Sequence, residues 1–304
     1  MSKFINNNFL KVSALMIFVG CWVVTQAQAQ SDSTRLLNTL AQLCGETANG
    51  RKPGTAGHQW AQELIIKQFQ EIGLEKISGS YLQSAVSTEG KTIQNIHGMI
   101  SGSSERYLLI TAHYDHLGER DSEVYYGCDD DASGVASMLE IARYFKEDPS
   151  QHSIIFIAFD REEEGLLGSK YWADNPPIPL KEIDLIFNMD MVSKNDKNEI
   201  YASGAYHHPY LKRPIEEVGA HFKNLVVRFG HDRPMSGPDD WTYASDHGPF
   251  FRKGVPHIYF GVEDHPYYHK PTDTFERTSF SFYSKVTNFL ISTVERLDND
   301  LPNE

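Results

Sequence analysis

The chain has 304 residues, of which 40% are hydrophobic and 23% are charged, and its formal net charge at pH 7 is −13. This length corresponds to one large domain, or to one domain with a small appendage. The negative charge argues against nucleic acid and anionic membrane surfaces as partners.

The first 29 residues have the features of a cleaved secretory signal. Lys3 and Lys11 precede an apolar stretch at 12–24, and the small-x-small sequence Ala27-Gln28-Ala29 follows it. The apolar stretch is too short for a membrane span. We therefore expect a signal peptide at 1–29 and an exported protein, periplasmic or secreted. Loss of the two lysines changes the formal charge from −13 to −15.

A lipid anchor at Cys21 is the less favoured alternative. Gly20 precedes this cysteine, but Phe18 and Val19 fit the lipoprotein processing pattern poorly, and Trp22 follows. The expected mature domain at 30–304 contains Cys44 and Cys128. An exported protein could pair them. The sequence does not give the distance between the two cysteines in the folded protein, and Cys128 adjoins an acidic cluster. We therefore expect both thiols to be unpaired.

The remaining apolar pattern predicts strands that alternate with helices. In chain order we expect a helix at 57–72 ended by Gly73, strands at 95–101 and 107–112, a helix at 134–145, a strand at 153–159, a helix near 165–174, a strand at 184–191, a helix at 208–220, a strand at 225–229, a helix at 246–253, a strand at 256–260 and a helix at 279–297. This order predicts a single α/β domain with a central, mixed but mostly parallel sheet flanked by helices on both faces. Residues 231–245 form a long loop, a kind of segment that is often functional.

An acidic cluster, Asp160-Arg161-Glu162-Glu163-Glu164, follows the strand predicted at 153–159. The strand is short and rich in Ile and Phe, as strands buried on both faces are. Open α/β sheets hold ligands at the carboxyl ends of such strands. One glutamate could bind a metal while its neighbour acts as a base. Three glutamates taken alone are equally compatible with a solvated loop.

Candidate ligands also follow the neighbouring strands. His113-Tyr114-Asp115-His116 follows one strand, and Asp190 lies at the end of another. An acidic turn at 127–134 opens a helix, and His269 lies near the end of the chain. Histidine and carboxylate ligands without thiolate suit a catalytic rather than a structural zinc site. Taken alone, His113 reads as a hydrogen-bonded strand-end histidine and Asp130 as a helix cap, although Asp131 or Ser133 better suits the cap.

Five sequence blocks resemble the co-catalytic zinc aminopeptidases of the M28 family. They are H-Y-D, G-x-D-D-D-x-S-G, E-E-x-G-L-x-G-S, N-M-D-M and H-x-P-T-D-T, in the order and spacing of that family across roughly residues 50–275. Residues 50–55 also resemble its amino-terminal block. The resemblance implies a zinc-peptidase fold of the phosphorylase/hydrolase-like type.

The resemblance also implies two zinc ions per chain and a ligand set. The expected ligands are His113, Asp130, Glu163, Asp190 and His269. In this arrangement Asp130 bridges the ions, His113 and Asp190 share one ion, and Glu163 and His269 share the other. The family pattern further implies a cis peptide bond between Asp130 and Asp131. With Glu162, the site gathers four carboxylates, whose charge of −4 two zinc ions would balance.

Three catalytic roles follow from the same comparison. Glu162 is the expected general base that takes a proton from the metal-activated water. Asp115 orients the ring of His113. Tyr268 either donates to the developing oxyanion or packs beside the site.

Other residues near the motifs have weaker implications. Asp246 and His247 recur near the site in the family. A supporting role for them and no role at the site are equally compatible with the sequence. The histidines at 116, 207, 208, 231 and 265 are expected to have local or surface roles. The family often has Arg or Cys where Ala244 stands, and a small residue where Cys128 stands. Both departures concern substrate contacts.

The resulting functional hypothesis is an exported di-zinc aminopeptidase that acts on peptides with free amino termini. The metal-site carboxylates, with Asp246, Asp239 or Asp240 as further candidates, could pair with the substrate ammonium. A carboxypeptidase would need a cationic pocket, for which the loop offers only Arg233. A single-zinc acyltransferase of the glutaminyl cyclase type is the main alternative. A non-catalytic binding module would be indicated by loss of a ligand or of the base, and none is lost. The sequence predicts neither the preferred amino-terminal residue nor the oligomeric state.

Overall fold

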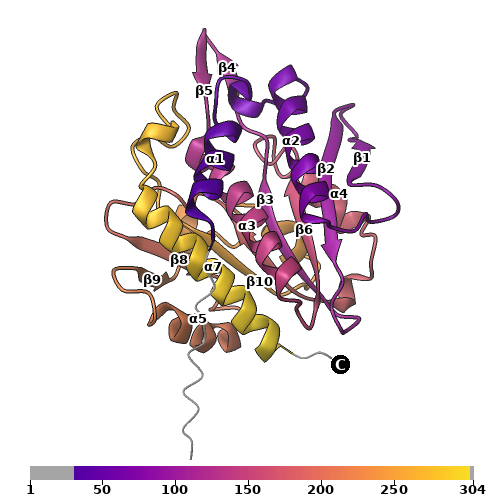
Figure 1. The fold of residues 1–304 in the computed structure, drawn as a ribbon, viewed down its shortest axis with the longest axis vertical. Coiled ribbons are helices and arrows are strands. Elements are labelled where there is room, and N and C mark those ends of the chain that lie inside the picture. The colour runs from indigo at the N-terminus through magenta and orange to yellow at the C-terminus, as the bar shows by residue number, and fades with distance from the viewer. Residues whose placement is uncertain (1–30, 302–304) are drawn as a thin grey trace, which may run out of the picture.

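The computed structural model describes residues 31–301, so the expected signal peptide lies outside the described residues. Its main feature is an eight-stranded sheet in the order β1-β2-β6-β3-β7-β10-β8-β9 (Figure 1). The strands are β1 Leu82–Val86, β2 Thr92–Ile100, β3 Tyr107–His113, β6 Ser153–Phe159, β7 Ile183–Met189, β8 Glu199–Ser203, β9 Val226–Phe229 and β10 His257–Gly261. A separate hairpin of β4 (Gly118–Arg120) and β5 (Glu123–Tyr125) projects from one end.

The centre of the sheet is parallel and its flanks are mixed. β3 pairs in parallel with β6 and β7, and β7 pairs in parallel with β10. Antiparallel pairs join β1 to β2, β2 to β6, and β8 to β10. The predicted mixed, mostly parallel sheet is therefore confirmed, and the carboxyl ends of β6, β3, β7 and β10 meet along one edge.

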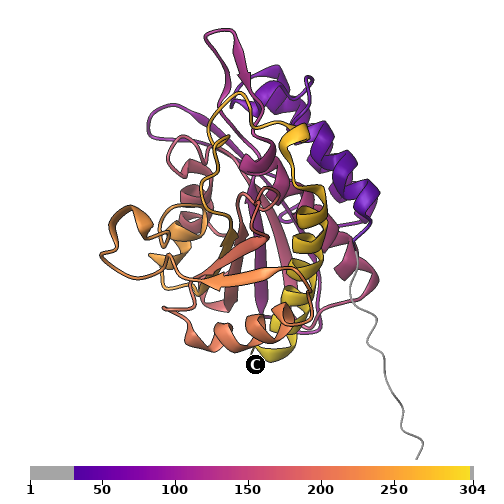
Figure 2. The ribbon, with the colours of Figure 1, turned by 90° about the vertical axis from the view of Figure 1, so that its left-hand side faces the viewer.

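Helices cover both faces of the sheet (Figures 1 and 2). One face carries α1 (Ser33–Leu43), α2 (Ala56–Ile72), α3 (Gly134–Glu147), α5 (Lys212–Gly219) and α7 (Phe280–Asp300). The other face carries α4 (Leu167–Asp174) and α6 (His247–Phe251). None of the helices in the described part of the chain is both long and apolar enough to cross a membrane.

Alternation along β6 builds the two cores. Its even-numbered residues from Ile154 to Ala158 join the larger apolar cluster under α2, α3 and α7. Its odd-numbered residues from Ile155 to Phe159 join a smaller cluster with Trp172 of α4 and Phe250 of α6. Successive side chains of a strand point to opposite faces, so a strand between two helix layers must be apolar at every position.

Five elements were not predicted: α1, β1, β4, β5 and β8. The four strands have five residues or fewer, and a short strand carries too few residues for a clear alternation. The helix expected at 208–220 begins as a 3₁₀ turn, Pro209–Leu211, before the α-helical segment α5.

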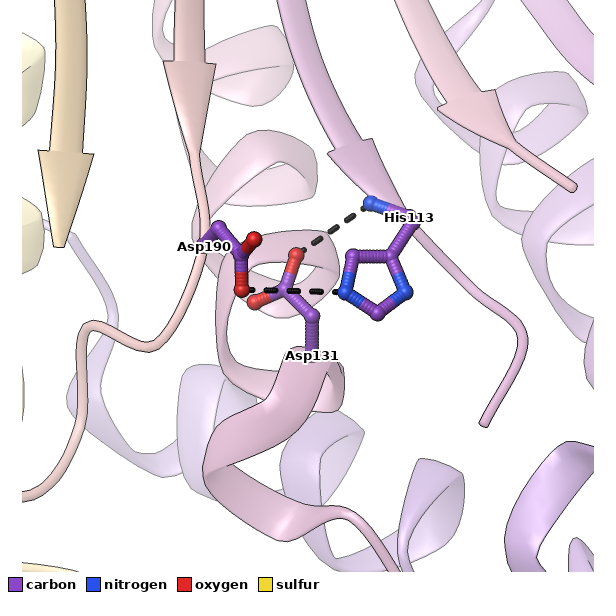
Figure 3. A group of neighbouring side chains, drawn as sticks. All are labelled: His113, Asp131 and Asp190. Atoms are coloured by element: carbon purple, nitrogen blue, oxygen red, sulfur yellow. Dashed lines mark hydrogen bonds and ion pairs between the residues drawn. The ribbon is translucent and has the colours of Figure 1, made fainter. Parts of the chain in front are cut away.

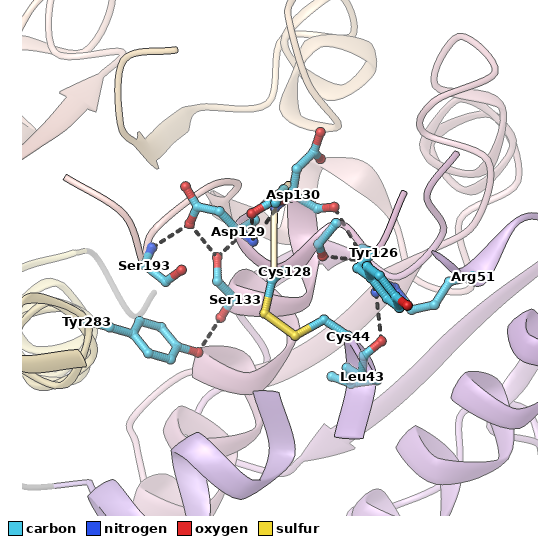
Figure 4. The surroundings of a disulfide bond; sticks show 12 residues. Leu43, Cys44, Arg51, Tyr126, Cys128, Asp129, Asp130, Ser133, Ser193 and Tyr283 are labelled. Carbon is cyan, nitrogen blue, oxygen red and sulfur yellow. Dashed lines mark hydrogen bonds between the residues drawn. A yellow bond between two sulfur atoms is a disulfide. The ribbon is translucent and has the colours of Figure 1, made fainter. Parts of the chain in front are cut away.

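The expectation that the two cysteines are unpaired is wrong. Cys44 and Cys128 form a disulfide although 84 residues separate them. Cys44 is the C-cap of α1, and this unforeseen helix brings its Cα to 5.0 Å from that of Cys128. The bond therefore ties the amino-terminal helix to the acidic turn that precedes α3 (Figure 4).

Candidate metal centre

The candidate ligands gather at the carboxyl edge of the parallel strands. His113 is the last residue of β3, Asp190 directly follows β7, and Glu163 lies just beyond β6. Asp130 comes from the helical turn Cys128–Ser133 at the start of α3, and His269 from the loop after β10. The edge of an open α/β sheet at its carboxyl ends is where ligands bind in this class of fold.

Asp130 lies between two histidines. Its Oδ1 is 3.2 Å from Nε2 of His113, and its Oδ2 is 3.1 Å from Nε2 of His269. On the far side, Asp190 Oδ1 lies 3.6 Å from His113 Nε2, and Glu163 Oε2 lies 3.2 Å from His269 Nε2. Two groups of donor atoms thus share one carboxylate, and each group combines one imidazole with two carboxylates.

The donor set fits bound cations. Oδ2 of Asp130 and Oε1 of Glu163 are buried without a hydrogen-bond partner among the described residues. Buried carboxylate oxygens without partners are rare and costly. Donors on one zinc ion lie no more than about 4.2 Å apart, because each bond is about 2.0–2.2 Å long. All four donor separations described above are within that limit.

Asp131 lies beside His113 and Asp190, close enough to be taken for a ligand (Figure 3). Its Oδ1 accepts backbone N–H groups from Gly134 and Met191, at 2.9 and 3.2 Å, and its Oδ2 accepts that of His113 at 3.2 Å. Both oxygens are therefore engaged with the backbone. Of the two residues expected to cap α3, Asp131 and Ser133, it is Asp131 whose side chain accepts the first N–H of the helix, and it also joins the segments that carry His113 and Asp190.

The backbone around Asp130 is fixed from several sides. The peptide bond between Asp130 and Asp131 is cis, as predicted. The carboxylate of Asp273 accepts the N–H of Asp129, at 3.0 and 3.1 Å, and that of Asp130 at 3.2 Å. This accounts for the aspartate of the H-x-P-T-D-T block, to which the sequence analysis assigned no role.

Arg51 supports the same turn and was also missed (Figure 4). Its fully buried guanidinium donates only to backbone carbonyls: those of Leu43, Tyr114, Tyr126, Gly127 and Asp130, at 2.7 to 3.3 Å. It connects α1, the segment after His113 and the acidic turn. The matching signal in the sequence was the block at 50–55, which carried no residue-level prediction.

The three consecutive glutamates have different surroundings. Glu163 faces His269, as described above, and Glu162 lines the adjacent cavity. Glu164 lies away from the centre and forms ion pairs with Arg161 and Lys91 at 2.8 and 2.7 Å. Burial raises the pKa of Glu162 well above its usual value; His113 opposes this shift, and Asp190 adds to it.

Asp115 contacts both His113 and the glutamate segment. His113 Nδ1 lies 3.1 Å from the backbone carbonyl of Asp115 and 3.7 Å from its Oδ1. The same Oδ1 accepts the N–H of Glu162 at 2.9 Å, and Oδ2 accepts that of Glu163 at 3.4 Å. The ring is thus oriented mainly by the main chain of Asp115, while the carboxylate holds the two glutamates.

A cavity of about 100 Å³ opens onto the centre. Its walls combine the polar groups of the site with an apolar side: Met191, Trp241, Ala244, Tyr259, Val262 and Tyr268. Asp264 is exposed at the cavity and was not predicted from the sequence. The ring of Tyr268 stacks on His269 with 4.0 Å between centroids, and burial raises the pKa of its phenol, which therefore stays protonated.

The 231–245 loop contributes Trp241 to the cavity wall. Trp241 stacks on His231 with centroids 3.7 Å apart, and its carbonyl lies 3.0 Å from Nε2 of His247. Asp246 is fully buried and does not line the cavity, and burial raises its pKa to about 7 despite the opposing charge of His113. Asp239 and Asp240 also lie outside the cavity lining.

The other histidines have mostly local contacts. His265 bonds to Asp129 at 2.9 Å, and His207 lies 3.2 Å from the hydroxyl of Thr242. His208 packs against His257. His116 differs, because it is buried at the centre with its Nδ1 2.7 Å from Oε1 of Glu163. Of the local or surface role expected for His116, the surface position is wrong, because the ring is buried.

Comparison with known proteins agrees with this architecture. The sequence profile described as "Peptidase family M28" matches residues 95–294, about two thirds of the chain. The chain therefore belongs to peptidase family M28. It is 32% identical over 206 residues to Aminopeptidase YwaD of Bacillus subtilis, a match covering 62% of this chain and 41% of that protein. The chain thus spans less than half of the length of this relative.

Solved structures share the fold at lower identity. A glutaminyl cyclase of Porphyromonas gingivalis superposes with a TM-score of 0.72 at 20% identity, over 88% of this chain and 98% of the cyclase. BSAP, a zinc aminopeptidase of Bacillus subtilis, superposes with a TM-score of 0.71 at 19% identity, over 91% of this chain and 97% of BSAP. The fold alone does not separate the two activities.

Proposed function

We propose that the protein is an exported aminopeptidase that holds two zinc ions and removes residues from the free amino termini of peptides. The observation that carries the proposal is the carboxylate of Asp130, whose two oxygens face two different histidines. A single ion would leave one of these oxygens, with either Asp190 or Glu163, without a cation. The donor set therefore favours a two-metal peptidase over a single-zinc cyclase.

His113, Asp130 and Asp190 would hold one ion, and Asp130, Glu163 and His269 the other. When bound, such ions lower the pKa of water and polarise a carbonyl group. The carboxylates of Asp130, Glu162, Glu163 and Asp190 bring a charge of −4, which two divalent ions neutralise. Buried charges without such compensation would be strongly destabilising.

Glu162 is the proposed general base. It lines the cavity and belongs to neither group of donor atoms around Asp130, so its carboxylate is available to the substrate. It would take a proton from the attacking water and deliver that proton to the leaving amine. The hydrogen bond from its backbone N–H to the Asp115 carboxylate limits its movement. Tyr268, protonated and in the cavity wall, is the proposed donor to the developing oxyanion.

The cavity also supports recognition of a free amino terminus. Among the described residues, its lining contains the carboxylates of Asp130, Glu162, Asp190 and Asp264 and neither lysine nor arginine. A substrate ammonium would pair with Asp264, the lining carboxylate that is neither a proposed metal ligand nor the proposed base. The apolar wall with Trp241, Tyr259 and Val262 would accept the side chain of the first residue.

Export is supported by two independent features. The charged, apolar and small-residue pattern of residues 1–29 is typical of a secretory signal. The disulfide between Cys44 and Cys128 belongs to an oxidising compartment such as the periplasm or the extracellular space.

The test uses the chain from Gln30 to Glu304, freed of metal and then titrated with zinc. We expect no activity without metal, and hydrolysis of aminoacyl-arylamides and short peptides to reach its maximum at two ions per chain. Matched peptides with acetylated amino termini are the control and should be refused. Full activity at one ion per chain, or equal cleavage of acetylated peptides, would refute the proposal. Cyclisation of amino-terminal glutamine without hydrolysis would instead identify a cyclase.

A further inference from the structure

One buried histidine at the metal centre has no role in the ligand set described above. His116 is 1% exposed, and its Nδ1 lies 2.7 Å from Oε1 of Glu163 and 3.7 Å from Oδ2 of Asp130. These are donor atoms from the half of the centre that also contains His269. The ring of His116 lies 5.9 Å from the ring of His269, measured between centroids.

The same three donor atoms lack hydrogen bonds. Within residues 31–301, neither Nδ1 of His116, nor Oε1 of Glu163, nor Oδ2 of Asp130 has a hydrogen-bond partner. The contact between His116 and Glu163 is short, but its geometry is not that of a hydrogen bond. Buried polar atoms are nearly always satisfied. These three atoms converge on one point, an arrangement that fits a shared cation.

We propose that His116 is an additional ligand of the second ion, alongside Asp130, Glu163 and His269. This inference rests on the proposed di-metal function. Nδ1 of His116 lies 2.7 Å from Oε1 of Glu163 and 3.7 Å from Oδ2 of Asp130. Both distances are within the roughly 4.2 Å that can separate two donor atoms on one zinc ion. The second ion then has two imidazole and two carboxylate ligands, whereas the first has one imidazole, from His113, and two carboxylates.

The fold holds the His116 ring in this position. A Cβ atom at Gly127 would lie 2.4 Å from two carbon atoms of the ring, so glycine is required there for the ring to fit. Gly127 also has a φ of +58°, which favours glycine independently. The backbone N–H of His116 donates to the carbonyl of Arg51 at 3.3 Å. The ring is therefore placed before any ion binds, which favours affinity at this half of the centre.

The ligand difference predicts two unequal ions. An extra buried imidazole strengthens the second site, so its ion should be the last to leave during chelation. The first site has fewer protein ligands. It would therefore leave more room for water and substrate, as catalytic zinc sites do.

Spectroscopy of the wild-type protein tests the ligand directly. The metal-free mature chain is loaded with two equivalents of Co²⁺, and the chain carries ¹⁵N-labelled histidine. Coordination to paramagnetic Co²⁺ shifts the ring signals of a histidine far outside the ordinary range. We expect such shifts for the three rings of His113, His116 and His269. Two bound ions with only two strongly shifted rings would overturn the proposal and leave the di-metal function intact.

The variant His116→Gln supplies the second measurement. We expect its zinc affinity at the tighter site to fall by at least about 10-fold, the lower end of the range seen when groups around a metal are altered. One strongly shifted ring should disappear from its Co²⁺ spectrum. His221→Gln, which removes an exposed histidine, is the matched control and should change neither quantity. Unchanged affinity in His116→Gln, or lowered affinity with all shifted rings retained, would overturn the ligand assignment. Failure of the wild type to bind two ions would instead refute the proposed function.

Discussion

Acidification from pH 7 to pH 5 should destabilise this protein through histidines that are buried in the neutral form. His257 of β10 and His247 of α6 are fully buried and stack with ring centroids 4.9 Å apart. In the described part of the chain neither ring nitrogen of His257 has a hydrogen-bond partner. Burial lowers the pKa of His247 to about 4, and burial together with the neighbouring histidines lowers that of His257 to about 2.

The sign and size of the effect follow from proton linkage. An unfolded histidine has a pKa of about 6.5, so below that pH the unfolded chain binds protons that the folded chain does not. The free energy of unfolding therefore decreases as the pH is lowered. At pH 5 each of these residues remains neutral in the folded state. The free energy of unfolding should then be lower by about 1.36 kcal/mol for each pH unit below 6.5, or about 2 kcal/mol per histidine.

The variant His257→Phe isolates one of these contributions. Phenylalanine preserves the aromatic contacts but cannot bind a proton, so the stability of the variant relative to wild type should rise by about 2 kcal/mol between pH 7 and pH 5. Urea unfolding of the chelated proteins at both pH values measures this difference, because chelation removes the separate effect of acid on metal binding. His221→Phe, at an exposed position, is the control. A difference between variant and wild type that stays constant to within about 0.5 kcal/mol would refute the reasoning.

Three further outcomes are expected. Glu162→Gln should keep both ions but lose more than about 100-fold in kcat, since only the proton carrier is removed; a loss of less than about tenfold, or about 1.4 kcal/mol of barrier, in steady-state assays would contradict its role as base. Asp264→Asn should raise KM for peptides with free amino termini and leave kcat nearly unchanged, and equal KM values for variant and wild type would remove it from ammonium binding. Cys44→Ser should lower the free energy of unfolding by about 2–4 kcal/mol, because the disulfide closes a long loop in the unfolded chain; unchanged urea midpoints under oxidising conditions would show that the bond contributes nothing.

The sequence by itself determined the fold class and the residues from which the centre is built. Buried strands such as β3 and β6 are continuous apolar runs, and the alternation of strands with helices predicts a mostly parallel sheet. Because parallel neighbours end at the same edge, the polar residues after each run, His113 and Glu163 among them, had to lie near one another. The motif blocks then supplied the remaining candidates and the cis bond at Asp130.

Only the tertiary structure decided which neighbouring polar groups face the centre and which support it. Asp131 is adjacent to Asp130 in the sequence, yet its carboxylate is engaged with three backbone N–H groups. Three contacts reach the acidic turn from distant segments: those of Arg51, of His116 and of the Cys44–Cys128 disulfide. The hydrophobic periodicity of those segments does not indicate these contacts. Periodicity reflects the faces of single elements, whereas these contacts depend on how distant elements approach. That approach is set by packing of the whole chain, which no local pattern encodes.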